Sequence, residues 1–141
     1  MKIQQLSLFV ENQPGHTAAP ARLLADEGID IRALSLADTE QFGIVRMIVS
    51  DWQKAAGILA AHGHVVKATE VLAVEVPDRP GGMADVLGAL DGSGINIEYM
   101  YAFPYPRGDQ AILIFRFNDP DAAIARLQMA GISVVAGPEL L

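Results

Sequence analysis

Two short turns in this chain place an Asn or Asp, a proline and a glycine directly before a predicted helix. They read Asn12-Gln13-Pro14-Gly15 and Asp78-Arg79-Pro80-Gly81. The first N–H groups of a helix have no intrahelical acceptor and carry partial positive charge, so a carboxylate can bind there. Glycine lets a ligand approach the backbone closely, and an Asn or Asp side chain can accept hydrogen bonds from an ammonium group. Each turn therefore has the chemistry to hold a small zwitterion.

The candidate ligand contacts come from these turns and from the strand that follows each helix. The backbone amides of the turns would bind a carboxylate, while the Asn and Asp side chains or the strand carbonyls would accept from an ammonium. The candidate residues are Asn12, Gly15, His16, Thr17, Ile29, Ile31, Asp78, Gly81, Gly82, Met83, Ile95, Asn96 and Ile97. Structural roles stay open beside binding, because Asx residues start helices and glycines meet turn geometry without any ligand.

The two turns belong to an internal repeat. Gly81 follows Gly15 by 66 positions (81 − 15 = 66), and Gly94 follows Gly28 by the same number. Later the spacing becomes 68, so the second copy has two added residues, which we place in the turn after its second strand. A period of this size indicates a tandem supersecondary unit. We expect one domain over residues 1–69 and another over 70–141.

Hydrophobic periodicity predicts the same βαββαβ order in both copies. Right-handed crossovers in that order give a four-stranded antiparallel sheet with both helices on one face, an α+β ferredoxin-like fold. The first copy has predicted strands at 3–10, 29–36, 43–49 and 65–69 and helices at 15–27 and 51–61. The second has strands at 72–76, 95–103, 111–117 and 132–135 and helices at 81–90 and 119–130, with turns expected at 38–41 and 104–109. Pro20 predicts an irregular first turn in the first helix.

Apolar side chains occur on both faces of one predicted strand, because Ile112 and Ile114 alternate with Leu113, Phe115 and Phe117. We expect the second face to be buried by the sister unit or by another copy of the chain. Two further apolar sets follow a regular spacing. They are the helical stripe Met83, Val86, Leu87 and Leu90, and the aromatic row Tyr99, Tyr101, Phe103 and Tyr105, which suits either a ligand pocket or a packed core or interface.

Composition excludes several classes of function. The net charge is −7 and cysteine is absent, so neither thiolate chemistry nor disulfides are available. Without a basic run, we expect no nucleic-acid or membrane partner, and without a signal peptide we expect a cytoplasmic location. His62 and His64 lack a third nearby ligand, and no nucleophile–base grouping or phosphate loop occurs. We therefore predict no metal, no cofactor and no enzymatic activity.

The Asp-x-Pro-Gly turn, the helix and the following Gly-Ile-Asn-Ile resemble the ACT domain, a ferredoxin-like βαββαβ module. The second copy matches closely, through residues such as Asp78, Gly81 and Asn96, while the first has Asn12 and Asp30 at the corresponding places. The arrangement is similar to stand-alone tandem ACT proteins. The resemblance implies a non-catalytic sensor that binds a free amino acid where the turn of one unit faces the second strand of its neighbour. It also implies a homodimer that regulates an enzyme or transporter. The alternative is an assembly protein that has the fold and no ligand.

Overall fold

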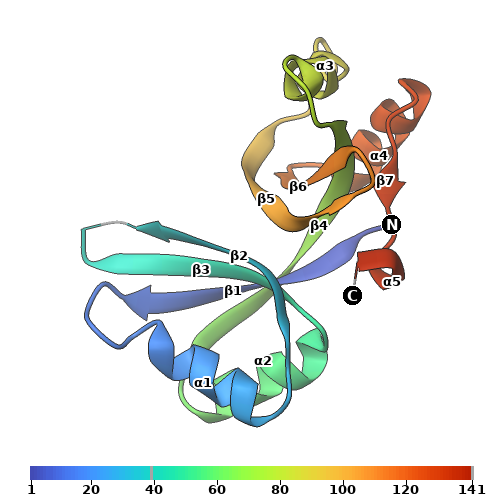
Figure 1. Ribbon diagram of the computed structural model, residues 1–141. Coiled ribbons are helices and arrows are strands. Elements are labelled where there is room, and N and C mark those ends of the chain that lie inside the picture. Colours follow the sequence, from blue (N-terminus) through green and yellow to red (C-terminus); the bar gives the residue numbers. More distant parts are fainter. Residues whose placement is uncertain (39, 141) are drawn as a thin grey trace. The chain divides into compact units, whose positions relative to one another are not determined.

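The computed structural model describes residues 1–38 and 40–140 (Figure 1). Position 39, within the predicted turn 38–41, and position 141 lie outside the described residues. The described chain separates into two compact units. We call Gln4–Thr69 the N-terminal unit, and Met1–Ile3 together with Glu70–Leu140 the C-terminal unit.

The N-terminal unit has the predicted βαββαβ order and an antiparallel sheet in the order β2-β3-β1-β4. The side chains of Leu8 and Val45 are paired across the sheet and pack with Leu24 of α1 and Leu59 of α2 in one core, so both helices cover the same face. The elements are β1 Ile3–Glu11, α1 Ala18–Asp26, β2 Ile31–Asp38, β3 Phe42–Val49, α2 Trp52–Ala61 and β4 Val65–Pro77.

The C-terminal unit repeats this arrangement, with β4 as its first strand and the sheet order β7-β4-β6-β5. Leu72 of β4 packs with Phe115 of β6, Val86 of α3 and Leu127 of α4, so its two helices also share one face. Phe115 and Phe117 stack with their ring centroids 5.3 Å apart. The further elements are α3 Gly82–Gly88, β5 Ile97–Arg107, β6 Gln110–Phe117, α4 Pro120–Met129, β7 Val134–Val135 and α5 Gly137–Leu140.

The repeat is visible in the backbone as well as in the sequence. Gly15 and Gly81 have φ of 85° and 86°, a conformation that favours glycine. Asp51 and Asp119 both cap a helix, each accepting from a backbone N–H three residues later at 3.1 Å. The predicted strands 65–69 and 72–76, by contrast, form one continuous strand of 13 residues, β4. The chain therefore passes from one repeat to the next without leaving extended conformation.

The expected turn over residues 104–109 is wrong. β5 continues to Arg107, and only Gly108 and Asp109 make the turn to β6. Phe103 pairs with Ile112 and Arg107 with Gln110, so four steps on β5 face two on β6. The two residues added in the second repeat are thus a bulge within a strand. β5 ends the sheet order, and an edge strand accepts proline because half of its N–H groups have no partner.

The second face of the β6 strand is buried, as predicted. Ile112 and Ile114 are 1% and 0% exposed, and the register places Tyr101 and Phe103 beside them. In this unit the short helix α5, which the periodicity did not predict, is held to β4 and β5 through Arg107. The Arg107 guanidinium lies 3.3 Å from the Glu75 carboxylate and 2.8 Å from that of Glu139 in α5.

The aromatic row divides at the bulge. Phe103 is buried, whereas Tyr105 is 56% exposed and meets the Phe103 ring edge-on at 5.9 Å. The predicted helical stripe also needs correction, because Met83 is 47% exposed while Val86 and Leu90 are buried. α3 begins at Gly82 and is only seven residues long, so Met83 lies in its first turn.

The first helix starts later than predicted. Residues 14–17 form hydrogen-bonded turns, and α1 begins at Ala18. Pro20 is then the third residue of the helix, where a missing N–H has no cost because the first four N–H groups lack intrahelical acceptors. The proline therefore delays the helix without kinking it.

The first residues of the chain belong to the C-terminal unit. The Lys2 ammonium lies 3.2 Å from the carboxylates of both Glu70 and Asp121. Hydrogen bonds to Glu70 and then to Asp121 raise the pKa of Lys2 above its ordinary value, because they stabilise the charged form. These ion pairs are solvent-exposed, so they contribute little to stability.

Candidate functional site

The two predicted ligand turns have matching backbone geometry. Each starts with a backbone bond to the hairpin turn of its own unit, from Asn12 N to Gln41 O at 2.9 Å and from Asp78 N to Asp109 O at 3.3 Å. Both side chains are exposed, and the Asp78 carboxylate accepts no hydrogen bond within the described part of the chain. The predicted acceptors therefore lie at the surface, at the mouth of each turn.

The turn amides are only partly available. The His16 N–H donates to Gln13 O at 3.3 Å and the Gly82 N–H to Arg79 O at 3.0 Å. Within residues 1–38 and 40–140, no carbonyl accepts from the amides of Gly15 and Thr17, or from those of Gly81 and Met83. Two amides per turn thus remain as donors for an anion.

Position 16 and its counterpart 82 differ sharply. A Cβ added to Gly82 would lie 2.0 Å from the Pro77 carbonyl oxygen, so the C-terminal turn is packed against the end of β4. His16 carries a full imidazole at the corresponding place, and its side chain is partly exposed. Gly82 is therefore required by close packing, and because it is buried and its N–H already donates to Arg79 O, it offers a ligand no donor.

Arg79 is a residue that the sequence reasoning missed. Its guanidinium donates to the Pro80 carbonyl at 3.2 Å and to the Asp85 carboxylate at 2.9 Å, across the start of α3. The side chain is 57% exposed, so its remaining N–H groups face solvent. Because Arg79 lies inside the Asp-x-Pro-Gly turn, its position in the motif could have indicated a cation beside the proposed carboxylate site.

The strand residues of the predicted site have structural roles. Asp30 and Ser50 exchange two hydrogen bonds of 3.0 Å, and Asn96 and Asn118 exchange two of 2.9 and 3.1 Å. The backbone carbonyls of Asp30 and Asn96, predicted as ammonium acceptors, each already accept one bond. The neighbouring side chains Ile29, Ile31, Ile95 and Ile97 pack into the two cores. The exposed Asn96 side chain has no hydrogen-bond partner among the described residues.

Two of the predicted residues come together beside α1. Thr17 and Ile31 line a small apolar hollow of about 40 Å³, with Pro20, Ala21 and Leu34. This hollow joins the start of α1 to the edge strand β2 of the same unit. It could take a methyl group or short aliphatic chain but no charged group.

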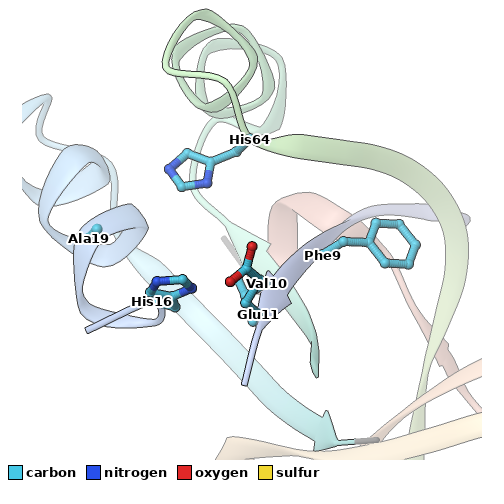
Figure 2. Close-up of a pocket in the computed structure, with 6 residues that line it drawn as sticks. All are labelled: Phe9, Val10, Glu11, His16, Ala19 and His64. Carbon is cyan, nitrogen blue, oxygen red and sulfur yellow. The ribbon is translucent and has the colours of Figure 1, made fainter. Parts of the chain in front are cut away.

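A larger hollow of about 330 Å³ lies beside the first turn (Figure 2). The Glu11 carboxylate and the imidazoles of His16 and His64 gather around it, while the Phe9 ring points away from them. Its lining residues are Phe9, Val10, Glu11, His16, Ala19 and His64. Sequence reasoning considered His64 only as a metal ligand together with His62, and set that role aside because no third ligand is near. In the structure the His62 imidazole lies 2.9 Å from the Ile58 carbonyl and is not among the residues that line this hollow.

Two absences hold for the described residues. No group of three His, Cys, Asp or Glu side chains there could hold a metal ion. Within the same residues, no helix has the length and apolar character needed to cross a membrane.

The described architecture agrees with known proteins. The chain is similar to protein BT0572 from Bacteroides thetaiotaomicron, with 36% identity over 99% of this chain and 96% of that one and a TM-score of 0.92. It shares its fold with the regulatory subunits of aspartate kinase from Thermus thermophilus (21% identity, 90% and 91% coverage, TM-score 0.64) and Thermus flavus (20%, 91% and 92%, TM-score 0.60). No curated protein matches the chain. The family model of the ACT domain pair matches residues 1–140, and the chain therefore belongs to the ACT domain family as a tandem pair.

Proposed function

We propose that this protein is a non-catalytic sensor that binds a free amino acid at its β1–α1 and β4–α3 turns. The observation that carries this proposal is the pair of unbonded amides in each turn, at Gly15 and Thr17 and at Gly81 and Met83. These amides can hold an α-carboxylate, and the exposed side chain at Asn12 or Asp78 can accept from the α-ammonium.

The C-terminal turn is the stronger of the two sites. It adds the Arg79 guanidinium to the unbonded amides, and it has a carboxylate at position 78 where the N-terminal turn has the neutral Asn12. A carboxylate accepts a charge-assisted hydrogen bond from an ammonium, which is stronger than a bond from a neutral amide oxygen. We therefore expect tighter binding at the C-terminal turn.

A regulatory role would follow from coupling ligand binding to association with another protein. Membership of the ACT domain pair family supports it, as does the shared fold with regulatory subunits of aspartate kinase. The partner in this proposal is an enzyme or transporter whose activity depends on the ligand-bound form.

A screen of the twenty amino acids by thermal unfolding tests the proposal. One chemical class should raise the unfolding temperature, because a ligand at 100 times its Kd stabilises the native state by roughly 2.7 kcal/mol. Glycolate and methylamine, each carrying only one of the two charged groups, are the controls and should act weakly. If all twenty amino acids leave unfolding unchanged, the sensor proposal is wrong.

An assembly protein without a ligand is the second candidate, and the edge strand β2 favours it. Leu34 and Leu36 on this strand are 57% and 55% exposed, although they align with Met47 and Val45 of the core face. An unpaired apolar edge is suited to pairing with another chain. The corresponding edge strand β5 is instead interrupted by prolines and a bulge. Either candidate is therefore compatible with a homodimer formed through β2.

Sedimentation equilibrium tests the dimer through β2. We expect a mass twice that of the 15.1 kDa chain. Leu36→Lys should shift the equilibrium roughly tenfold or more toward monomer, since it places a charge within the apolar edge. Ala102→Lys, at the corresponding exposed position of β5, is the matched control and should leave the mass unchanged. A dimer unaffected by Leu36→Lys would place the interface elsewhere.

A further inference from the structure

The three polar residues that line the hollow beside β1 can each accept a hydrogen bond, and one of them, Glu11, carries negative charge. Glu11 lines it and also lines an adjacent hollow of about 370 Å³, which Glu40 borders as well. No lysine or arginine is among the described residues that line either hollow. We propose that the hollow of Glu11, His16 and His64 is a second binding site, which takes the primary ammonium group of a small aliphatic amine.

The number of acceptors matches that ligand. A primary ammonium has three N–H donors, and the hollow offers the Glu11 carboxylate and one acceptor nitrogen from each neutral imidazole. Val10 and Ala19 supply an apolar wall for a short alkyl chain. A carboxylate ligand would instead face the Glu11 charge without a compensating cation. Among the described residues no group of three His, Cys, Asp or Glu side chains could hold a metal ion, whose ligands must lie closer than the roughly 2.9 Å of an ammonium hydrogen bond.

The polar side chains come from three separate segments with anchored backbones. Glu11 is the last residue of β1, and the backbone N–H of His16 donates to Gln13 O at 3.3 Å. His64 follows the α2 helix, and its backbone N–H donates to Leu59 O at 3.0 Å. Because hydrogen bonds within the N-terminal unit hold all three backbone positions, little backbone ordering would accompany binding.

The C-terminal unit provides a comparison, because it lacks the whole set. The positions corresponding to 11, 16 and 64 are Pro77, Gly82 and Ile132. At Gly82 even a methyl group would overlap the Pro77 carbonyl, so this unit has no space for the hollow. Two of the three histidines in the chain therefore line a hollow that the other repeat cannot form. The site uses side-chain acceptors, whereas the proposed amide site uses backbone donors in both units.

The test uses the full chain in phosphate buffer at pH 8, where a free imidazole is neutral. Binding of n-butylammonium and of butyrate is followed by NMR through the ring protons of His16 and His64. We expect n-butylammonium to shift both rings and butyrate to shift neither. Glu11→Gln and His64→Ile should each weaken n-butylammonium binding roughly tenfold or more, since each removes one acceptor. Asp26→Asn, at the exposed end of α1, is the control and should bind as wild type.

The outcomes separate this inference from the proposed function. Equal binding of the two probes, no binding of n-butylammonium, or unchanged binding in Glu11→Gln would overturn the ammonium site. An amino-acid response that persists in Glu11→Gln would then leave the proposed sensor standing. Conversely, n-butylammonium binding in a protein that responds to no amino acid would uphold the second site and overturn the sensor.

Discussion

Gly82→Ala is expected to destabilise the C-terminal unit by roughly 1–3 kcal/mol or more, the range of overpacked cores. The added methyl carbon would lie 2.0 Å from the Pro77 carbonyl oxygen and 3.0 Å from its carbonyl carbon. Both are backbone atoms at the end of a central strand, so they cannot move aside as a flexible side chain would. Urea unfolding followed by circular dichroism measures the change.

Gly88→Ala is the matched control within the same short helix. An added Cβ at Gly88 meets nothing within 4 Å, and its φ is not positive. Alanine there should stabilise the protein by roughly 0.5–1 kcal/mol through the lower entropy of the unfolded chain. Equal effects of the two substitutions would mean that the contact with Pro77 does not limit the packing of α3.

Asp78→Ala is expected to abolish the amino-acid response of the C-terminal turn and to leave the fold intact. The carboxylate is exposed and has no hydrogen-bond partner among the described residues, so its loss should change stability by less than about 0.5 kcal/mol. The measurement is the shift in unfolding temperature with the amino acid found by the screen. Wild-type binding by Asp78→Ala would show that another group accepts from the ammonium.

Two further variants at this turn separate charge from backbone shape. Asp78→Asn creates the residue type of the N-terminal turn, and we expect roughly tenfold weaker binding because an acceptor remains without its charge. Gly81→Val should abolish the response and also cost stability, since φ at this position is 86° and a β-branched residue rarely adopts it.

Much of the fold follows from local patterns in the sequence. The repeat, the two capping aspartates and the glycine-ended helices predicted the βαββαβ order, because caps and turn glycines act within a few residues. Burial of Ile112 and Ile114 was also predictable from their apolar character. The ends of the helices and strands were less predictable. Around Tyr105, periodicity could not distinguish a six-residue turn from a bulged edge strand, because proline occurs in both.

The candidate site shows a similar division. The sequence by itself determined the two turns and their glycines, because backbone conformation there is set by neighbouring residues. Which turn amides stay available became clear only from the structure, where the N–H groups of His16 and Gly82 are already bonded. Only the tertiary structure showed that Gly82 packs against the Pro77 carbonyl, whereas His16, at the corresponding position, lines a hollow with Glu11 and His64. His64 is 48 positions after His16 (64 − 16 = 48), and no local pattern links them. They line the same hollow because the sheet order sets β4 next to β1, and long-range pairing of this kind depends on the packing of the whole unit.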